Sequence, residues 1–262
     1  MAKRIKPGAA VDPIKVNAEA YNRLAIDYRT RTGSIDIAYP FDDFAKMLPV
    51  KRVMDVGCGP GRDVLTILQK GHQVVGVDIS AEMLRLGRER VAQFLKELKD
   101  SGGFLRERGY TEKSIDDVLG AMFHHAAMEN FPIGRPGFEK GSYGGLWAVT
   151  SVQHVQRTQL PAFLSQASEL LVPKGVMYVK TRAPFDNHPE DLLECLETSS
   201  ENQGQTFTRF FTYHKPEHLL NSLEEANFSV MRTSKGADGR IRYPSTNSGE
   251  QGYKFWIIAK KK

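Results

Sequence analysis

The amino-acid sequence predicts an α/β protein built on a doubly wound, mostly parallel β-sheet. The first observation is an apolar run at residues 53–56 that ends in a turn with three glycines, followed by helical periodicity over residues 64–68. The second is another apolar run, at residues 73–79, that follows this helix and precedes a second helical pattern. Strands that alternate with helices in this way are typical of parallel sheets with helices on both faces.

The glycine turn and the acid that closes the second run together predict a ligand site. Gly57, Gly59 and Gly61 let the backbone approach a ligand because no Cβ stands in the way. The helix that begins behind them offers free N–H groups to an anionic group. Asp78 lies 21 residues after Gly57, about the distance at which an acid at the end of a strand reaches a ribose diol. We therefore expect a ligand that carries a nucleoside.

Two kinds of enzyme use this arrangement, the dinucleotide-binding Rossmann enzymes and the S-adenosylmethionine (SAM) methyltransferases. The dinucleotide pattern is G-x-G-x-x-G. Here the spacing is G-x-G-x-G, with Asp55 two residues ahead and Arg62 where a third Rossmann glycine or alanine falls. The sequence therefore resembles the class I SAM-dependent methyltransferases of the small-molecule type. An NAD(P) enzyme is the alternative that this spacing disfavours.

The resemblance implies a Rossmann-like methyltransferase fold with seven strands, the last of them antiparallel, and it implies SAM as cofactor and S-adenosylhomocysteine as product. Tyr28 lies in a segment similar to the helix with which many such enzymes cover SAM. Residues 127–132 are similar to the family's adenine-contacting turn, although Ala127 stands where the family commonly has an acid. The expected SAM-binding residues are Tyr28, Asp55, Gly57, Cys58, Gly59, Gly61, Asp78, Ile79, Met83, Met128, Glu129 and Thr150.

One domain is expected over residues 1–262, with an N-terminal extension and cap helix over residues 1–48. Residues 1–16 are predicted to be a loose basic lead, and Asn17 is predicted to cap a helix that ends near Gly33. A short helix is predicted over residues 41–48, before the first strand.

The middle of the chain is predicted to add one insertion to the sheet. Ser80 is the predicted N-cap of a long helix. A glycine-interrupted, mixed-charge piece at residues 100–120 then reads as an insertion that forms part of a substrate lid. Strands three and four are predicted at residues 122–126 and 146–150.

The C-terminal part is predicted to supply the remaining strands and a second insertion. Strand five is expected at residues 176–180, and residues 183–212 are expected to be irregular and to wall the substrate pocket with their aromatic side chains. A helix over residues 216–226 and strands at residues 228–232 and 253–259 complete the sheet.

Three histidines are candidate general bases for an acceptor that arrives protonated, because an imidazole titrates near neutral pH. His154 follows strand four, and residues just past such a strand face the ligand crevice of a doubly wound sheet. His188 and His214 lie in segments that are expected to wall the pocket. The alternative for His154 is a residue that packs beside the cofactor and positions the substrate.

Composition limits the class of protein further. The chain has 262 residues and a formal net charge of +5, and its basic residues gather at both ends, where solvated tails explain them as well as RNA does. We expect no membrane span, because no apolar segment approaches the required length, and the basic start lacks the apolar core of a signal peptide. Only Cys58 and Cys195 are present, too few for a disulfide framework or a Cys-based zinc site, so a cytoplasmic location is expected. No metal site is expected, because no carboxylates cluster at the ends of strands four and five.

The expected acceptor is an O, N or S atom of a small organic molecule, since residues 150–154 lack the Asn/Asp-Pro-Pro-Tyr/Phe signature of enzymes that methylate nucleic-acid bases. An RNA- or ribosome-modifying enzyme is one alternative. A SAM-binding regulatory protein without turnover is the other. The chain is expected to be a monomer or a homodimer.

Overall fold

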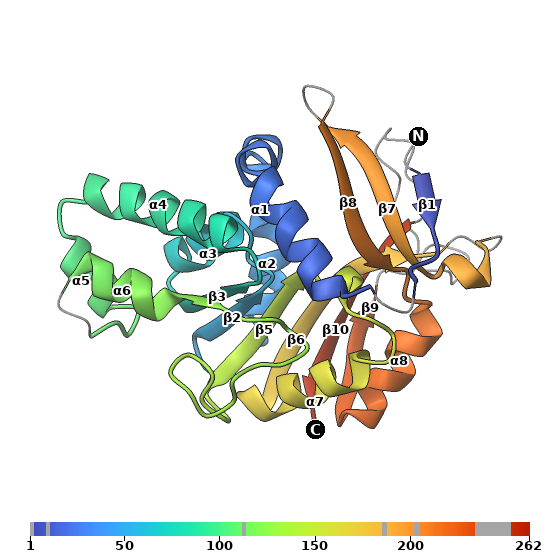
Figure 1. The fold of residues 1–262 in the computed structure, drawn as a ribbon. Helices are drawn as coiled ribbons and strands as arrows, with labels where there is room; N and C mark the ends of the chain where they lie inside the picture. Colours follow the sequence, from blue (N-terminus) through green and yellow to red (C-terminus); the bar gives the residue numbers. More distant parts are fainter. Residues whose placement is uncertain (1–2, 9–10, 112–113, 185–187, 202–204, 234–252) are drawn as a thin grey trace.

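A computed structural model describes residues 3–8, 11–111, 114–184, 188–201, 205–233 and 253–262. A central sheet carries helices on both faces, and a smaller sheet rises from one end of it (Figure 1). None of the helices in these ranges is both long enough and apolar enough to cross a bilayer.

The central sheet has seven strands in the order β4-β3-β2-β5-β6-β10-β9. Its first five strands in this order run parallel, and β10 runs antiparallel to both of its neighbours. The predicted doubly wound sheet with an antiparallel last strand is therefore confirmed. The strands are β2 (Arg52–Val56), β3 (Gln73–Asp78), β4 (Phe123–His125), β5 (Tyr143–Val149), β6 (Leu171–Ala183), β9 (Phe228–Thr233) and β10 (Tyr253–Lys261).

The strand order reverses between β2 and β5, because the chain passes from β2 to β3 and β4 on one side and returns to β5 on the other. In open α/β sheets, ligands bind outside the carboxyl ends of the strands at such a switch point. The topology thus predicts a ligand site at the loops that follow β2, β3 and β5.

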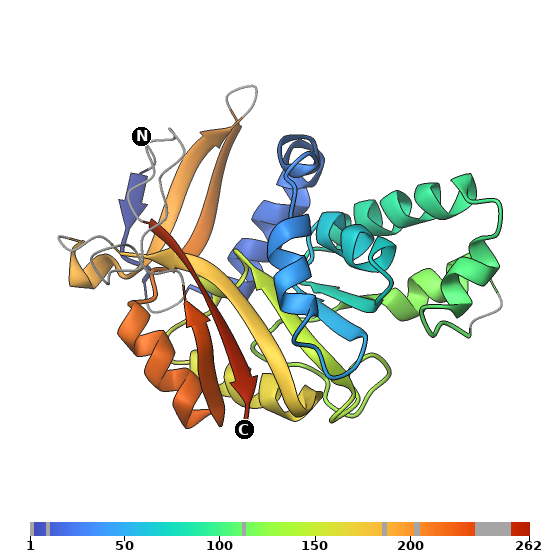
Figure 2. The same ribbon diagram turned by 180° about the vertical axis from the view of Figure 1, so that it is seen from behind.

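Side chains that alternate along the strands build a separate apolar cluster on each face of the sheet. One cluster packs under α7 (Leu160–Leu170) and α8 (Pro216–Glu225), which lie in front of the sheet in Figure 1. The other packs under helices that come to the front in Figure 2. These are α2 (Ala38–Ala45), α3 (Arg62–Gln69), α4 (Ala81–Glu97) and α6 (Ile115–Met122). Ser80 caps α4 as predicted, by accepting a hydrogen bond from the backbone N–H of Met83.

The N-terminal extension is more ordered than the sequence predicts. A short strand, β1 (Lys3–Ile5), replaces part of the expected loose lead, and α1 (Pro13–Thr32) begins four residues before Asn17. The predicted cap at Asn17 is wrong, because Asp12 accepts the first backbone N–H groups of the helix instead. The amide of Asn17 is buried and makes two hydrogen bonds to the backbone of Phe210.

The expectation of an irregular segment at residues 183–212 is also wrong. A 3₁₀ turn (η2, Glu190–Leu192) leads into β7 (Glu194–Glu201), which pairs antiparallel with β8 (Gln205–Thr212) and on its other side with β1. Phe207, Arg209 and Phe211 lie at alternate positions of β8 and therefore on one face of the hairpin. Residues 185–187 and 202–204 of the predicted insertion lie outside the described residues.

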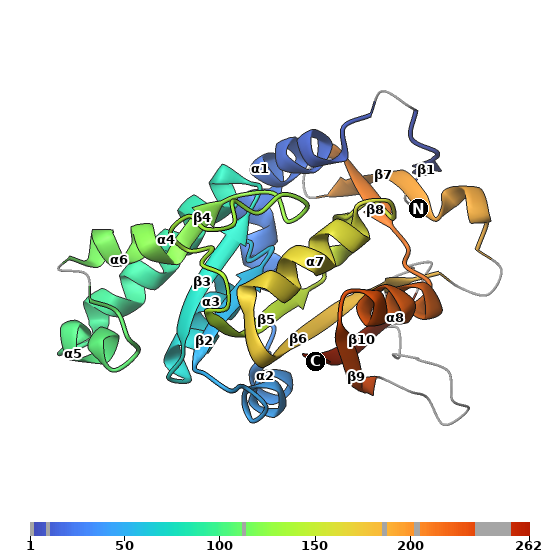
Figure 3. The same cartoon turned by 90° about the horizontal axis from the view of Figure 1, so that it is seen from below.

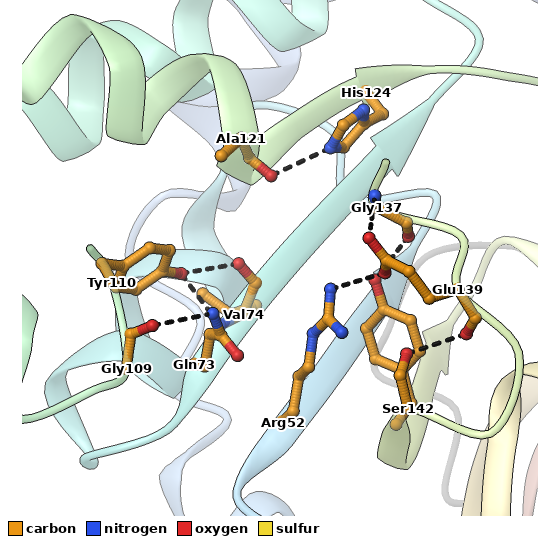
Figure 4. Close-up of polar contacts among 11 residues, drawn as sticks. Arg52, Gln73, Val74, Gly109, Tyr110, Ala121, His124, Gly137, Glu139 and Ser142 are labelled. Atoms are coloured by element: carbon orange, nitrogen blue, oxygen red, sulfur yellow. Dashed lines mark hydrogen bonds and ion pairs between the residues drawn. The ribbon is translucent and has the colours of Figure 1, made fainter. Parts of the chain in front are cut away.

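The predicted insertion at residues 100–120 lies at the β4 edge of the sheet, far from the β7–β8 hairpin (Figure 3). It contains a short helix, α5 (Ser101–Arg106), and the start of α6. Figure 4 shows how the chain that follows α5 is fixed to the sheet: the Tyr110 hydroxyl donates to the carbonyl oxygen of Val74 at 2.7 Å and accepts from its N–H at 3.0 Å. Nearby, Arg52 pairs with Glu139 at 2.8 Å and anchors the loop before β5.

Candidate functional site

The turn after β2 is shaped by close packing at two of its glycines. Gly57 and Gly61 have φ of +72° and +71°, a region that favours glycine. A Cβ on Gly57 would lie 2.4 Å from Cβ of Ser151, and a Cβ on Gly61 would lie 2.8 Å from Cα of Gly87. These positions therefore exclude a side chain because of the protein itself.

Gly59 is different, because the space beside it is open. Its φ is +52°, and a Cβ there would approach only Tyr28 and Met83, at 3.8 Å and 4.0 Å. The glycine at this position leaves room for something other than protein to lie against the backbone.

Asp78 joins the end of β3 to this turn. Its Oδ2 accepts a hydrogen bond from the backbone N–H of Gly59 at 2.9 Å, and its Oδ1 accepts one from that of Ser80 at 2.8 Å. Burial raises the pKa of the Asp78 carboxyl, and these backbone N–H groups act against the rise. Each carboxylate oxygen keeps further acceptor capacity, so the group can receive hydroxyl donors from a ligand.

A second acid, Asp55, lies buried at the end of β2. Burial raises its pKa well above the usual range, and the nearby charge of Asp63 acts in the same direction. Asp63 itself pairs with Arg62 and accepts a hydrogen bond from the indole N–H of Trp147 at 2.9 Å. The two acids thus differ in their surroundings: Asp63 has a guanidinium and an indole as partners, whereas burial favours the neutral form of Asp55.

Two hollows open at the carboxyl edge of the sheet, and they share the residues Tyr21, Tyr28, Gly57, Val149 and Thr150. The first encloses about 580 Å³ of empty space next to Gly59 and Asp78. The second encloses about 1960 Å³ and extends toward β6 and the β7–β8 hairpin. The predicted residues that line the first hollow are Tyr28, Gly57, Gly59, Asp78, Ile79, Met83, Met128, Thr150 and His154.

The remaining predicted residues lie around the hollows in different ways. Asp55 lines only the second. Gly61, Cys58 and Glu129 are absent from both linings. Cys58 is buried behind the turn, against Gly76, and burial raises the pKa of its thiol well above the usual range. Burial also raises the pKa of Glu129.

Thr150 ends β5 in an unusual backbone conformation. Its φ is +58°, in the left-handed region that a β-branched residue rarely adopts. Its N–H donates to the carbonyl oxygen of Lys180 at 2.7 Å, which holds the turn against β6. Strained residues of this kind gather at functional sites, where the surrounding structure enforces them.

His154 lies in a short 3₁₀ helix after β5 (η1, Val152–His154) and has a partner on each ring nitrogen. Its Nδ1 is 2.7 Å from the carbonyl oxygen of Phe210, and its Nε2 is 2.8 Å from the hydroxyl of Tyr21. Because a carbonyl only accepts, Nδ1 carries the proton, and the neutral ring accepts from Tyr21 through Nε2. Burial lowers the pKa of His154 to about 3 and raises that of Tyr21 to about 12.

The other two candidate histidines do not line either hollow. His214 is buried, and its Nε2 donates to the carbonyl oxygen of Val152 at 3.1 Å. Burial lowers its pKa to about 4. His188 lies against the ring of Tyr213 and donates to the carbonyl oxygen of Leu192. The structure thus brings one of the three histidines to the site.

Several residues of the hollows are absent from the sequence-based predictions. Lys180 and Arg182 on β6, and Arg209 on β8, line the second hollow, and Tyr21 lines both. The sequence contains a signal for Lys180 and Arg182, because these two basic residues stand at alternate positions at the end of the predicted strand five. Nothing local marks Arg209, because only the hairpin carries it to the site.

Metal-binding groups do not gather in the described part of the chain: no three His, Cys, Asp or Glu side chains lie together there as ion ligands would. The absence of a metal from the reaction remains an expectation.

Comparison with known proteins identifies the relatives of this fold. A family model described as a methyltransferase domain matches residues 26–233. Trans-aconitate 2-methyltransferase of Rhodopseudomonas palustris (strain BisB5) is 38% identical over 82 residues, which are 29% of this chain and 28% of that protein. The protein of the same name from Deinococcus radiodurans is 26% identical over 174 residues, 66% of this chain and 54% of that protein. The matched segments thus span between about a quarter and half of these curated relatives.

Among solved structures, magnesium protoporphyrin IX methyltransferase from Synechocystis PCC 6803, determined with bound SAM, superposes with a TM-score of 0.59. The match covers 98% of this chain and 100% of that one, at 16% sequence identity. At this identity the likeness concerns the fold.

Proposed function

The chain belongs to the class I SAM-dependent methyltransferases, and on this premise we propose that it transfers the methyl group of SAM to an oxygen, nitrogen or sulfur atom of a small organic molecule. The observation that carries the proposal is the first hollow. There the backbone N–H of Gly59, which has open space beside it, donates to the buried carboxylate of Asp78 at 2.9 Å. This pairing is what a nucleoside-bearing donor requires of its site.

The residues of the first hollow fit SAM. The missing Cβ of Gly59 leaves the backbone of the turn open to it. In this proposal the carboxylate of Asp78 holds the ribose hydroxyls, and Asp55 and the turn face the amino-acid end. Apolar contacts to the adenine come from Ile79, Met83 and Met128, while Tyr28 covers the site.

Three predicted residues take supporting roles in the proposal, since they line neither hollow. Gly61 lets α3 begin close to α4, and Cys58 fills the space behind the turn. Glu129 contributes its backbone, whose carbonyl oxygen accepts from the side chain of Gln166 at 3.0 Å.

When bound, SAM supplies a sulfonium whose methyl group is already activated, so the protein has mainly to align the acceptor and exclude water. Tyr21 and Thr150 lie where the two hollows meet. Because the Tyr21 hydroxyl donates its hydrogen bond to His154, its oxygen can only accept from the substrate, as it does from the Arg209 side chain. We assign Tyr21 the task of orienting the acceptor's O–H or N–H group.

His154 is proposed as a positioning residue in place of the general base. A ring with a pKa of about 3 and a hydrogen bond on each nitrogen is a poor base at neutral pH. His154 fixes the orientation of Tyr21 by accepting the hydrogen bond that the Tyr21 hydroxyl donates. His188 and His214, outside both linings, support the fold around the site.

The domain organisation matches the separation of the site into a donor side, the first hollow, and an acceptor side, the second hollow. We propose one domain with additions, of which the N-terminal extension and the β7–β8 hairpin wall the acceptor side. In support, Tyr21 and Tyr28 come from α1, and Glu197, Ser199, Arg209 and Phe211 come from the hairpin. The described residues of segment 100–120 add nothing to either lining, so we propose that this segment packs at the β4 edge without walling the acceptor side.

The acceptor class is tested by following the methyl group. Purified protein is incubated with SAM labelled in its methyl group, together with either a small-molecule extract or total RNA. Label in low-mass products supports the proposal, whereas label in RNA supports the RNA-modifying alternative. Protein that binds SAM and transfers label to neither fraction would support the regulatory alternative.

A further inference from the structure

The second hollow has a basic end that the transfer of a methyl group does not require. Lys180 and Arg182 lie two residues apart on β6, so they face the same side of the sheet. Arg209 reaches the hollow from β8 of the hairpin. Three cationic side chains, from strands of two different sheets, therefore line the second hollow.

A single carboxylate, Glu197, accompanies these cations from the described parts of β6, β7 and β8 that line the hollow. Its Oε2 lies 3.1 Å from Nε of Arg4 and 3.6 Å from a terminal nitrogen of Arg182, and it accepts from the Tyr213 hydroxyl at 3.2 Å. Glu197 thus already faces two guanidinium groups. Among the described side chains of β6, β7 and β8 that line the hollow, three are cationic and one is anionic by formal charge.

The remaining acids of the second hollow do not reverse this excess. Asp63 pairs with Arg62, and burial raises the pKa of Asp55 and so favours its neutral form. Asp36, between α1 and α2, also lines the hollow, as does Arg31 of α1, which pairs with Asp27 at 2.7 Å. By formal charge the lining has five basic side chains (Arg31, Arg62, Lys180, Arg182 and Arg209) and four acidic ones (Asp36, Asp55, Asp63 and Glu197). The lining as a whole is therefore net positive.

The positive charge acts at the point where the two hollows meet. The charges of Arg209 and Arg182 oppose the burial that raises the pKa of Tyr21, and the same two charges help burial to lower the pKa of His154. Both guanidinium groups are therefore close enough to act on the Tyr21–His154 pair. A negative group placed between them would lie beside the proposed transfer site.

Aromatic rings at the edge of the hollow hold the guanidinium groups in place. Cζ of Arg182 lies 4.4 Å from the ring centre of Phe211, and Cζ of Arg209 lies 5.4 Å from the same centre. Trp147 and Tyr178 stack at 4.2 Å between ring centres, and both line the hollow. Guanidinium groups fixed over rings keep their N–H forks in a plane, which suits oxyanions with two oxygens.

We propose that the methyl acceptor is a small organic acid, whose carboxylate is held by Arg182 and Arg209 with Lys180 alongside. This inference rests on the proposed function and adds the chemical class of the substrate. The acceptor atom can be a carboxylate oxygen or another group of the same molecule that reaches Tyr21.

The test measures anion binding separately from SAM binding. Calorimetry first gives the affinity of the protein for S-adenosylhomocysteine. The same protein, with and without S-adenosylhomocysteine, is then titrated with benzoate and succinate, with their neutral amides, and with inorganic phosphate. We expect the acids to bind and the amides to bind about ten- to a hundredfold more weakly, as the loss of a charge-assisted pair predicts. Phosphate binding stronger than that of either acid would overturn the choice of a carboxylate.

Variants assign the binding to the basic end. Arg209→Gln and Lys180→Gln each remove one charge, and Arg85→Gln removes one from the exposed face of α4 as the matched control. We expect Arg209→Gln to weaken acid binding about tenfold or more, Lys180→Gln to weaken it less, and Arg85→Gln to leave it unchanged. Unchanged affinity for S-adenosylhomocysteine and an unchanged melting temperature show that each variant is folded.

The inference is overturned by acids and amides that bind alike, by no binding of either acid at millimolar concentration, or by an Arg209→Gln variant that binds acids as the wild type does. Failure of the proposed function is a separate result. In that case the wild type does not bind S-adenosylhomocysteine, whatever the acid titrations give.

Discussion

The hydroxyl of Tyr21 lies 2.8 Å from Nε2 of His154, where the cap helix meets the end of β5. The other ring nitrogen of His154 bonds the carbonyl oxygen of Phe210 on β8, and the backbone of Phe210 also bonds Asn17 of the cap helix. The peptide of Phe210 thus joins three parts of the chain that are distant in sequence. This connection fixes the tautomer of the histidine and, through it, the direction of the Tyr21 hydroxyl.

Tyr21→Phe removes this hydroxyl and keeps the ring. We expect turnover to fall about tenfold, the effect of one lost hydrogen bond to a reacting group. The affinity for SAM should stay close to that of the wild type, because Asp78 and the glycine turn are untouched. Initial rates of S-adenosylhomocysteine release and calorimetry with SAM measure the two effects. Wild-type turnover in Tyr21→Phe would contradict the role of Tyr21.

Asp78→Ala is expected to weaken SAM binding by about ten- to a hundredfold, because a buried carboxylate that holds hydroxyl donors contributes charge-assisted hydrogen bonds. Calorimetry gives the affinity. Asp116→Asn, at an exposed position in the first turn of α6, is the control for the loss of one negative charge. Equal affinity in Asp78→Ala and the wild type would remove Asp78 from the donor site.

Gly59→Ala tests the open space beside the turn. Gly59 and Gly71 both have positive φ, at +52° and +86°, and a Cβ on Gly71 meets nothing within 4 Å. The two alanine variants should therefore lose similar stability, about 1 kcal/mol each for the left-handed backbone. Only Gly59→Ala should lose SAM affinity, because its new methyl group occupies the hollow. Chemical denaturation and calorimetry separate the effects, and equal SAM binding by the two variants would contradict this placement of the ligand.

Acid should destabilise the protein through His214. Its folded-state pKa of about 4 lies below the ordinary value of 6.5, so the unfolded chain binds the proton first as the pH falls. The free energy of unfolding should therefore decrease between pH 6.5 and pH 4, by about 1.4 kcal/mol per pH unit from this group. His214→Gln keeps a donor for Val152 and removes the titration. Urea unfolding at several pH values should give a shallower slope for the variant, and identical slopes would show that His214 is not held neutral.

The sequence predicts the central sheet well because its signals are local. The turn at residues 57–61 has positive φ at each of its three glycines, and Asp78 ends a strand that is rich in valine. Strand alternation with helices then determines which loops share an edge of the sheet. The fold and the nucleoside-facing residues follow from such patterns.

The acceptor side could not be predicted in the same way. Its residues depend on contacts between distant segments, such as the pairing of β1 with β7 and the bond between Asn17 and Phe210, 193 residues apart. Polar residues dominate the hairpin sequence, so it resembles a loop until its partner strand is known. For His154, position alone indicated the site, but the lowered pKa arises from burial under Tyr21 and Phe211, which only the folded structure supplies.

The most direct measurement is a pair of calorimetric titrations of the purified protein, one with SAM and one with NAD⁺. We expect saturable binding of SAM at one site per chain, weakened by Asp78→Ala, and no binding of NAD⁺. Binding of NAD⁺ with no binding of SAM would contradict the assignment of the glycine turn and Asp78 to a methyl donor.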